Sequence, residues 1–193
     1  MGYGNRQLDG FLSDIASASV TPAGGTAGAV VGAIGTACCE MVCIHLKAAE
    51  VATDVDLAAL RADFKGTRGR LLELGGADAA VVDALFGPDA EPDHATRTRA
   101  VSVPLAMAET CVEVLETAAV LTGAADRPVV ADAAPGSSFL DAALRSAVAT
   151  ARTNLAAVND ESFRDETEDR LTEVEAAADR ALATVRANVD HGA

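Results

Sequence analysis

Residues 21–39 give the strongest indication of the fold and read Thr-Pro-Ala-Gly-Gly-Thr-Ala-Gly-Ala-Val-Val-Gly-Ala-Ile-Gly-Thr-Ala-Cys-Cys. A proline- and glycine-containing turn at 21–26 leads into a run of small apolar residues at 27–39, and no charged residue occurs between Asp14 and Glu40. Small side chains let neighbouring helices approach closely. The stretch therefore predicts a Gly/Ala-rich helix buried at the centre of a helical bundle. A membrane span is the weaker alternative, because the run is shorter than the ~20 residues that cross a bilayer.

The rest of the chain also has the sequence pattern of helices. The 193 residues include 43 alanines, the residue with the highest helix propensity. Apolar residues recur in steps of three and four, the spacing of one helix face. This spacing occurs in two segments: Val101, Leu105, Ala108, Val112, Leu115 and Ala119, and Leu171, Val174, Ala178, Ala181 and Val185. Both segments predict long amphipathic helices.

Glycine, proline and asparagine mark the expected helix ends. The breaks fall at Gly75-Gly76, at 87–92, at 123–128, at 132–138 and at Asn159-Asp160. We therefore predict helices at about 6–18, 26–53, 56–74, 77–86, 94–122, 138–157 and 160–189. Antiparallel packing of these helices predicts an all-α, up-and-down helical bundle in a single domain over residues 5–190.

Charge and composition exclude two classes of partner. The net charge is −14 and aromatic residues make up 3% of the chain, which argues against nucleic acid and against an anionic membrane surface. Only two basic residues are lysines, Lys47 and Lys65, and this bias with many carboxylates suggests a salt-rich, halophilic cytosol. Four cysteines and no signal-peptide pattern at residues 1–14 predict a reduced, cytoplasmic protein.

The turn before the uncharged helix is a candidate binding site. A helix start offers unpaired backbone amides and the positive end of the helix dipole, and glycines let a ligand reach them. Gly24, Gly25 and the Thr26 hydroxyl therefore favour binding of an anion or a carbonyl oxygen. The alternative is that Pro22 and the glycines only shape a tight entry into the helix.

Two polar residues in apolar surroundings are candidates for chemistry. Asp132 stands alone among valines and alanines, and it is either a helix cap or a carboxylate kept for catalysis, because burying it unpaired is costly. Asn154 interrupts an apolar and hydroxylated segment. Cys38, Cys39, Cys43 and His45 are spread over two faces of a single helix, which cannot close a tetrahedral site with them, so we expect no metal site there.

Taken in order, several short motifs resemble the cyclodeaminase/cyclohydrolase family of folate one-carbon metabolism. The motifs are Phe11-Leu12, Ala16 to Ser19, Pro22 to Thr26, Gly32 to Gly35, Met41-Val42, Asp78 to Ala80 with Asp83, Val103 to Leu105, Ala131 to Ala133, Asn154-Leu155, and Asp160 with Phe163. They keep their order over almost the whole chain. Ala23, Thr26 and Thr150 depart from the residues usual in relatives.

The resemblance implies an all-helical homodimer that binds a tetrahydrofolate derivative and needs neither a metal nor another cofactor. It implies hydrolysis of 5,10-methenyltetrahydrofolate to the 10-formyl compound. The alternatives are a formiminotetrahydrofolate cyclodeaminase that releases ammonia and a catalytically inert helical scaffold. The residues that it suggests are Asp132 and Asn154 for catalysis, and Pro22, Gly24, Gly25, Thr26 and Asp83 for substrate binding.

Overall fold

The computed structural model describes residues 7–88, 90–124 and 128–191, and all regular elements in these residues are helices. In chain order these are α1 (Leu8–Ile15), α2 (Gly24–Ala48), α3 (Leu57–Phe86), α4 (His94–Gly123), the short 3-10 helix η2 (Pro128–Asp132), α5 (Ala133–Leu155) and α6 (Glu161–His191). The prediction of an all-helical fold is confirmed.

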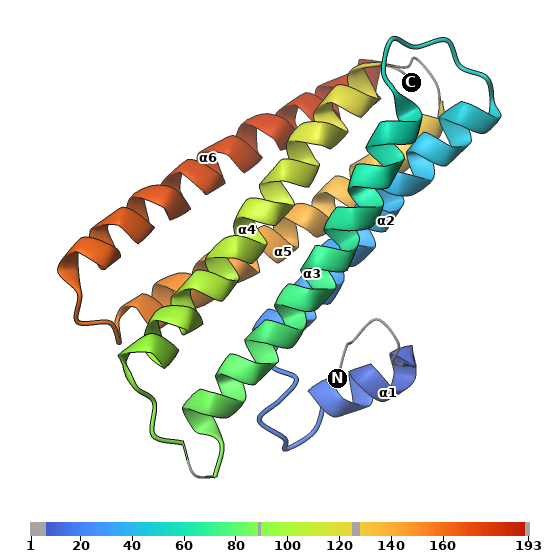
Figure 1. The fold of residues 1–193 in the computed structure, drawn as a ribbon. Helices are drawn as coiled ribbons and strands as arrows, with labels where there is room; N and C mark the ends of the chain where they lie inside the picture. The colour runs from blue at the N-terminus through green and yellow to red at the C-terminus, as the bar shows by residue number, and fades with distance from the viewer. Residues whose placement is uncertain (1–6, 89, 125–127, 192–193) are drawn as a thin grey trace.

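Helices α2, α3, α4 and α5 form a closed ring in which chain neighbours run antiparallel (Figure 1). Helix α2 completes the ring by packing against both α3 and α5. Helix α6 lies outside the ring, across α4 and α5, and α1 lies apart near the start of α2 (Figure 1). The ring therefore brings the start of α2, the end of α3, the start of α4 and the end of α5 to the same end of the bundle.

Helix α2 is not the central helix that its composition predicted. Its inner face is buried against α3 and α5, but Ile34 and Ile44 on the outer face are 46% and 38% exposed. By length and mean hydropathy, 1.8 in its most apolar window, α2 is the one helix among the described residues that could cross a bilayer. Half of that window is buried inside the bundle. This Gly/Ala-rich helix forms one wall of the bundle rather than its axis.

The predicted break at Gly75-Gly76 is wrong, because α3 continues through it from Leu57 to Phe86. A Cβ atom added at Gly75 would lie 3.0 Å from the Cβ of Ala29 on α2. The glycine therefore allows α2 and α3 to pack closely, and this packing outweighs the low helix propensity of glycine. Two predicted helices, 56–74 and 77–86, are in fact one.

Other boundaries shift by a few residues, while the predicted buried faces hold. Helix α5 begins at Ala133 rather than at 138, since Pro135 falls in the first turn, where a helix tolerates proline. Helix α2 ends at Ala48 rather than at 53. The five apolar residues predicted to share a face of α6 are all buried, and those of α4 are buried or partly buried.

Three of the long helices begin with an aspartate that caps its own helix. The Asp56 carboxylate accepts hydrogen bonds from the amides of Ala58 and Ala59, and Asp93 caps α4 in the same way. Asp160 accepts from the amide of Phe163 at the start of α6. Helix α2 differs, because alanine stands at its N-cap position and provides no cap.

Candidate active site at the start of α2

The missing cap of α2 is supplied by a residue of another helix. The carboxylate of Asp78, from α3, accepts hydrogen bonds from the hydroxyl of Thr26, at 2.8 Å, and from its backbone N–H. An anion at a helix N-terminus is stabilised by the unpaired amides and by the helix dipole. Asp78 therefore occupies the position that the sequence suggested for a bound anion.

Gly25 makes this arrangement possible. A Cβ atom added to Gly25 would come within 2.3 Å of Asp78 Oδ1, much closer than two such atoms can approach. The neighbouring Gly24 has open space at the same position. Of the two glycines, only Gly25 is required for the carboxylate to rest on the first turn of α2.

A cavity of about 350 Å³ opens beside this carboxylate. It lies at the end of the bundle where α2 and α4 begin and α3 and α5 end. Its lining combines an apolar wall with a few polar groups. The lining residues are Val20, Ala23, Gly24, Gly25, Asp78, Val81, Val82, Leu85, Phe86, Ala100, Val103, Pro104, Thr150 and Asn154. Cavities of this composition are typical of sites for small organic ligands.

The pKa of the Asp78 carboxyl is raised by its environment. Burial is the main cause, since the residue is only 5% exposed and the charged form loses its contact with water. The two hydrogen bonds from Thr26 stabilise the charged form and oppose this rise. A buried carboxyl with a raised pKa beside a cavity is a candidate group for proton transfer.

Asn154 and Thr150 bring polar groups from α5 to the same cavity. They are four residues apart and share one helix face. The Asn154 amide nitrogen donates to the backbone carbonyl of Ala100 on α4, at 2.7 Å, and the Thr150 hydroxyl donates to the carbonyl of Ser146 in its own helix. Thr150 therefore contributes a hydroxyl oxygen to the cavity lining.

Only some of the residues predicted to bind substrate line the cavity. Gly24 and Gly25 line the cavity, whereas Thr26 is fully buried and directs its hydroxyl at Asp78. Pro22 is buried outside the cavity lining. Asp83 is exposed and accepts a hydrogen bond from the Thr21 hydroxyl, at 3.1 Å, so that it holds the turn before α2.

Asp132 and Asn154 do not lie together within one chain. Asp132 ends η2 just before α5 begins, is exposed, and does not line the cavity. Asn154 is at the other end of α5, which at 1.5 Å per residue is about 33 Å away. Asp132 lies instead near Cys38, whose pKa is raised by burial and by the negative charge of Asp132.

Sequence reasoning missed Asp78 as a functional residue, although it lies in one of the family motifs. The feature that singled out Asp132, a lone carboxylate in an apolar segment, is equally present at residues 77–82 around Asp78. The 52-residue separation of Asp78 from Thr26 gave no indication that the two residues meet. Only the packing of α3 on α2 distinguishes the two aspartates.

The remaining cysteines and histidines show no sign of a reactive centre. Burial raises the pKa of Cys39 and of Cys111 to about 12 and that of Cys43 to about 11, so these groups stay protonated thiols. In the described part of the chain, no three His, Cys, Asp or Glu side chains converge as metal ligands. His45 and His94 are exposed on the surface, and the side chain of His191 lies outside the described residues.

Comparisons with known proteins agree with this architecture. The methenyltetrahydrofolate cyclohydrolase of Methylorubrum extorquens is 29% identical, over 97% of this chain and 99% of its own length. The crystal structure of formiminotetrahydrofolate cyclodeaminase from Thermotoga maritima superposes with a TM-score of 0.89 at 19% identity, covering 97% of this chain and 98% of that one. A sequence model of the formiminotransferase-cyclodeaminase family matches residues 7–173. The chain therefore belongs to the formiminotransferase-cyclodeaminase family.

Proposed function

We propose that this protein is a folate one-carbon enzyme that hydrolyses 5,10-methenyltetrahydrofolate to 10-formyltetrahydrofolate. The observation that carries the proposal is the buried carboxylate of Asp78, which lines one cavity together with the carboxamide of Asn154. The full-length similarity to a methenyltetrahydrofolate cyclohydrolase supports the same reaction.

The reaction needs one group that accepts a proton and then returns it. The methenyl bridge is a cationic carbon held between N5 and N10. Asp78, as a carboxylate, takes a proton from water while the water oxygen bonds to this carbon, and the electrons of the C=N bond move to N5. The tetrahedral intermediate then collapses: the carbon–N5 bond breaks and N5 receives the proton from Asp78. The second water proton leaves the hydroxyl for solvent as the formyl group forms on N10.

The surroundings of Asp78 suit both halves of this cycle. As a carboxylate, it is opposite in charge to the bridge and is held by the hydroxyl and amide of Thr26. Burial raises its pKa and so makes the carboxylate a stronger base than an exposed aspartate. The apolar wall, which includes Val81, Val103 and Phe86, gives the ring system of the substrate a surface to pack against.

A cyclodeaminase is the second candidate, because the family to which the chain belongs includes that activity in its name. In this reaction N10 attacks an N5-formimino carbon and ammonia leaves. The intermediate is again a tetrahedral carbon bonded to nitrogen, and the same carboxyl would protonate the leaving amine. The two reactions therefore share the Asp78 carboxyl and differ in the substrate supplied and in the attacking atom.

We further propose that the protein works as a homodimer whose interface includes the outer face of α2. This face leaves Ile34 and Ile44 exposed, as is typical of surfaces that associate. Within one chain the geometry favours Asp78 over Asp132 for proton transfer. In a dimer, Asp132 of the partner subunit remains a separate hypothesis, and an Asp132→Asn variant with full turnover would remove Asp132 from the mechanism.

The experiment that tests the function follows the near-ultraviolet absorbance of 5,10-methenyltetrahydrofolate with the purified protein, in low and in molar salt. Loss of the signal above the buffer rate supports the hydrolase. Appearance of the signal from the 5-formimino compound, with ammonia release, supports the cyclodeaminase. No change in either assay from folded protein would contradict both and would favour the inert scaffold.

A further inference from the structure

Pro104 lies in the interior of α4, where proline is unfavourable. In a regular helix the N–H of residue 104 would donate to the carbonyl of residue 100. Proline has no N–H, so the Ala100 carbonyl lacks its helical partner. Both residues are buried, and both line the cavity.

The free carbonyl of Ala100 is used by Asn154. The Asn154 Nδ2 atom donates to it at 2.7 Å. A carbonyl can only accept, so the nitrogen of the carboxamide must face it and the oxygen must lie on the opposite side of the planar group. Within the described part of the chain, no protein group donates to that oxygen, Asn154 Oδ1, and Asn154 lines the cavity.

We infer that Pro104 is a positioning residue for the reaction: by leaving the Ala100 carbonyl free, it fixes the Asn154 carboxamide with its oxygen available as an acceptor in the cavity. This inference rests on the proposed hydrolase function. The attacking water has two hydrogens, of which one goes to Asp78. The Asn154 oxygen accepts a hydrogen bond from the other and so aims the water oxygen at the methenyl carbon.

The inference also gives a joint role to Pro104 and Asn154, which are far apart in the sequence. A proline in a helix interior weakens that helix, and such a local cost is common where a site requires it. Asn154 lies 54 residues from the carbonyl that it binds. Neither Pro104 nor Asn154 alone predicts this hydrogen bond. Together, the proline leaves the Ala100 carbonyl free and the asparagine donates to it.

The test is the Pro104→Ala variant. It restores an N–H at position 104 that competes with Asn154 for the Ala100 carbonyl. We expect kcat for methenyltetrahydrofolate hydrolysis to fall about 10- to 100-fold, as for a misaligned catalytic group, with KM changed less than about twofold. The thermal midpoint should stay equal or rise, because alanine is the better helix former. Wild-type kcat in this variant would overturn the inference.

Two further measurements separate positioning from a general effect on folding. In an Asn154→Ala background, Pro104→Ala should change kcat no further, because the group it positions is already gone; multiplying effects would contradict the inference. The side-chain amide resonance of Asn154, assigned by its loss in Asn154→Ala, should shift in Pro104→Ala. An unshifted resonance would contradict the inference as well.

Pro135→Ala is the matched control, since Pro135 is exposed in the first turn of α5, where no helical N–H bond is lost. It should leave both kcat and the Asn154 resonance unchanged. The resonance also separates this inference from the proposed function. An inactive wild type whose Asn154 resonance shifts in Pro104→Ala would overturn the hydrolase and would still support the positioning of Asn154.

Discussion

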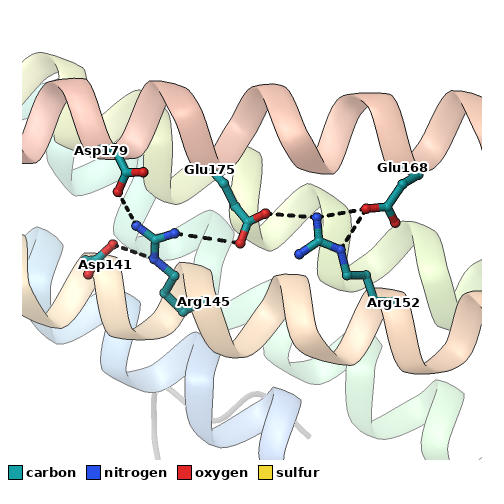
Figure 2. Close-up of polar contacts among 6 residues, drawn as sticks. All are labelled: Asp141, Arg145, Arg152, Glu168, Glu175 and Asp179. Atoms are coloured by element: carbon teal, nitrogen blue, oxygen red, sulfur yellow. Dashed lines mark hydrogen bonds and ion pairs between the residues drawn. The ribbon is translucent and has the colours of Figure 1, made fainter.

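Carboxylates in two regions of this molecule differ in their burial and in their partners. At the cavity, the carboxylate of Asp78 is buried on the first turn of α2, where it accepts hydrogen bonds from the hydroxyl and the amide of Thr26. Along the outer side of α5, carboxylates of α6 face two arginines in a row of ion pairs (Figure 2). Arg145 pairs with Asp141, Glu175 and Asp179, and Arg152 pairs with Glu168 and Glu175.

Burial, more than the number of partners, therefore distinguishes the carboxylate suited to proton transfer from those that form surface ion pairs. Arg145 and Arg152 are 39% and 38% exposed, so water and salt screen their ion pairs. These pairs align α6 on α5 and contribute modestly to stability. Asp78 is only 5% exposed, so the same chemical group has a raised pKa there and is suited to proton transfer.

The largest effect is expected from Asp78→Asn, which removes the proposed base and keeps the shape of the side chain. Turnover of methenyltetrahydrofolate should fall about 100-fold or more, the usual contribution of a general base. The thermal midpoint at neutral pH should not fall, because a buried charge is replaced by a neutral group that still accepts from Thr26. Unchanged turnover would remove the cavity from the mechanism.

The same variant should change how stability depends on pH. In the wild type, the folded state holds the Asp78 proton more tightly than the unfolded chain, whose carboxyl titrates near 3.8. The free energy of unfolding contributed by this group is therefore greatest below pH 3.8 and decreases as the pH rises through the folded pKa. Denaturant titrations across this range should show that the advantage of Asp78→Asn over wild type grows with pH. A constant difference would mean that the pKa of Asp78 is not raised.

A smaller effect is expected from Gly25→Ala, with Gly24→Ala as its matched control. The Gly25 methyl group would overlap the Asp78 carboxylate and displace it, so turnover should fall at least about tenfold, and the thermal midpoint should fall as well. The Gly24 methyl group meets open space, so that variant should keep its midpoint. Equal midpoints for the two variants, measured by circular dichroism, would show that the close contact at Gly25 is unimportant.

Replacing both arginines of the other region should affect stability and not chemistry. We expect Arg145→Ala with Arg152→Ala to lower the free energy of unfolding by about 1 kcal/mol in total, a figure reduced for solvent screening. The turnover number should stay within about twofold of wild type, because neither arginine lines the cavity. Denaturant unfolding and the absorbance assay measure both quantities on one preparation, and a large loss of turnover would mean that the two regions are coupled.

Salt should have the smallest effect on turnover at the cavity, but it should measurably change the stability that depends on the surface charges. The wild-type net charge of −14 predicts a midpoint that rises between dilute buffer and molar potassium chloride, as screening reduces self-repulsion. The double arginine variant, at −14 − 2 = −16, should gain more from salt than the wild type. A wild type that is equally stable in dilute buffer would refute the halophilic hypothesis.

The sequence predicts the bundle better than it predicts the site. Periodicity identified the buried faces of α4 and α6, because each is set by residues within one helix. The use of glycine as a helix-end signal failed at Gly75, where the glycine allows close packing of two helices. The sequence pattern singled out Asp132 and not Asp78, since burial of a carboxylate depends on which helix packs over it.

The cap that Asp78 provides for α2 also has a consequence for the order in which the enzyme folds. In α3, α4 and α6 a local aspartate caps the first turn, so those turns can form early and independently. The first turn of α2 and the proposed base are joined only when α3 docks, which closes a loop of 52 residues. A refolding chain should therefore regain its circular dichroism before it regains turnover. The rate at which turnover recovers would then report the rate at which α3 docks on α2.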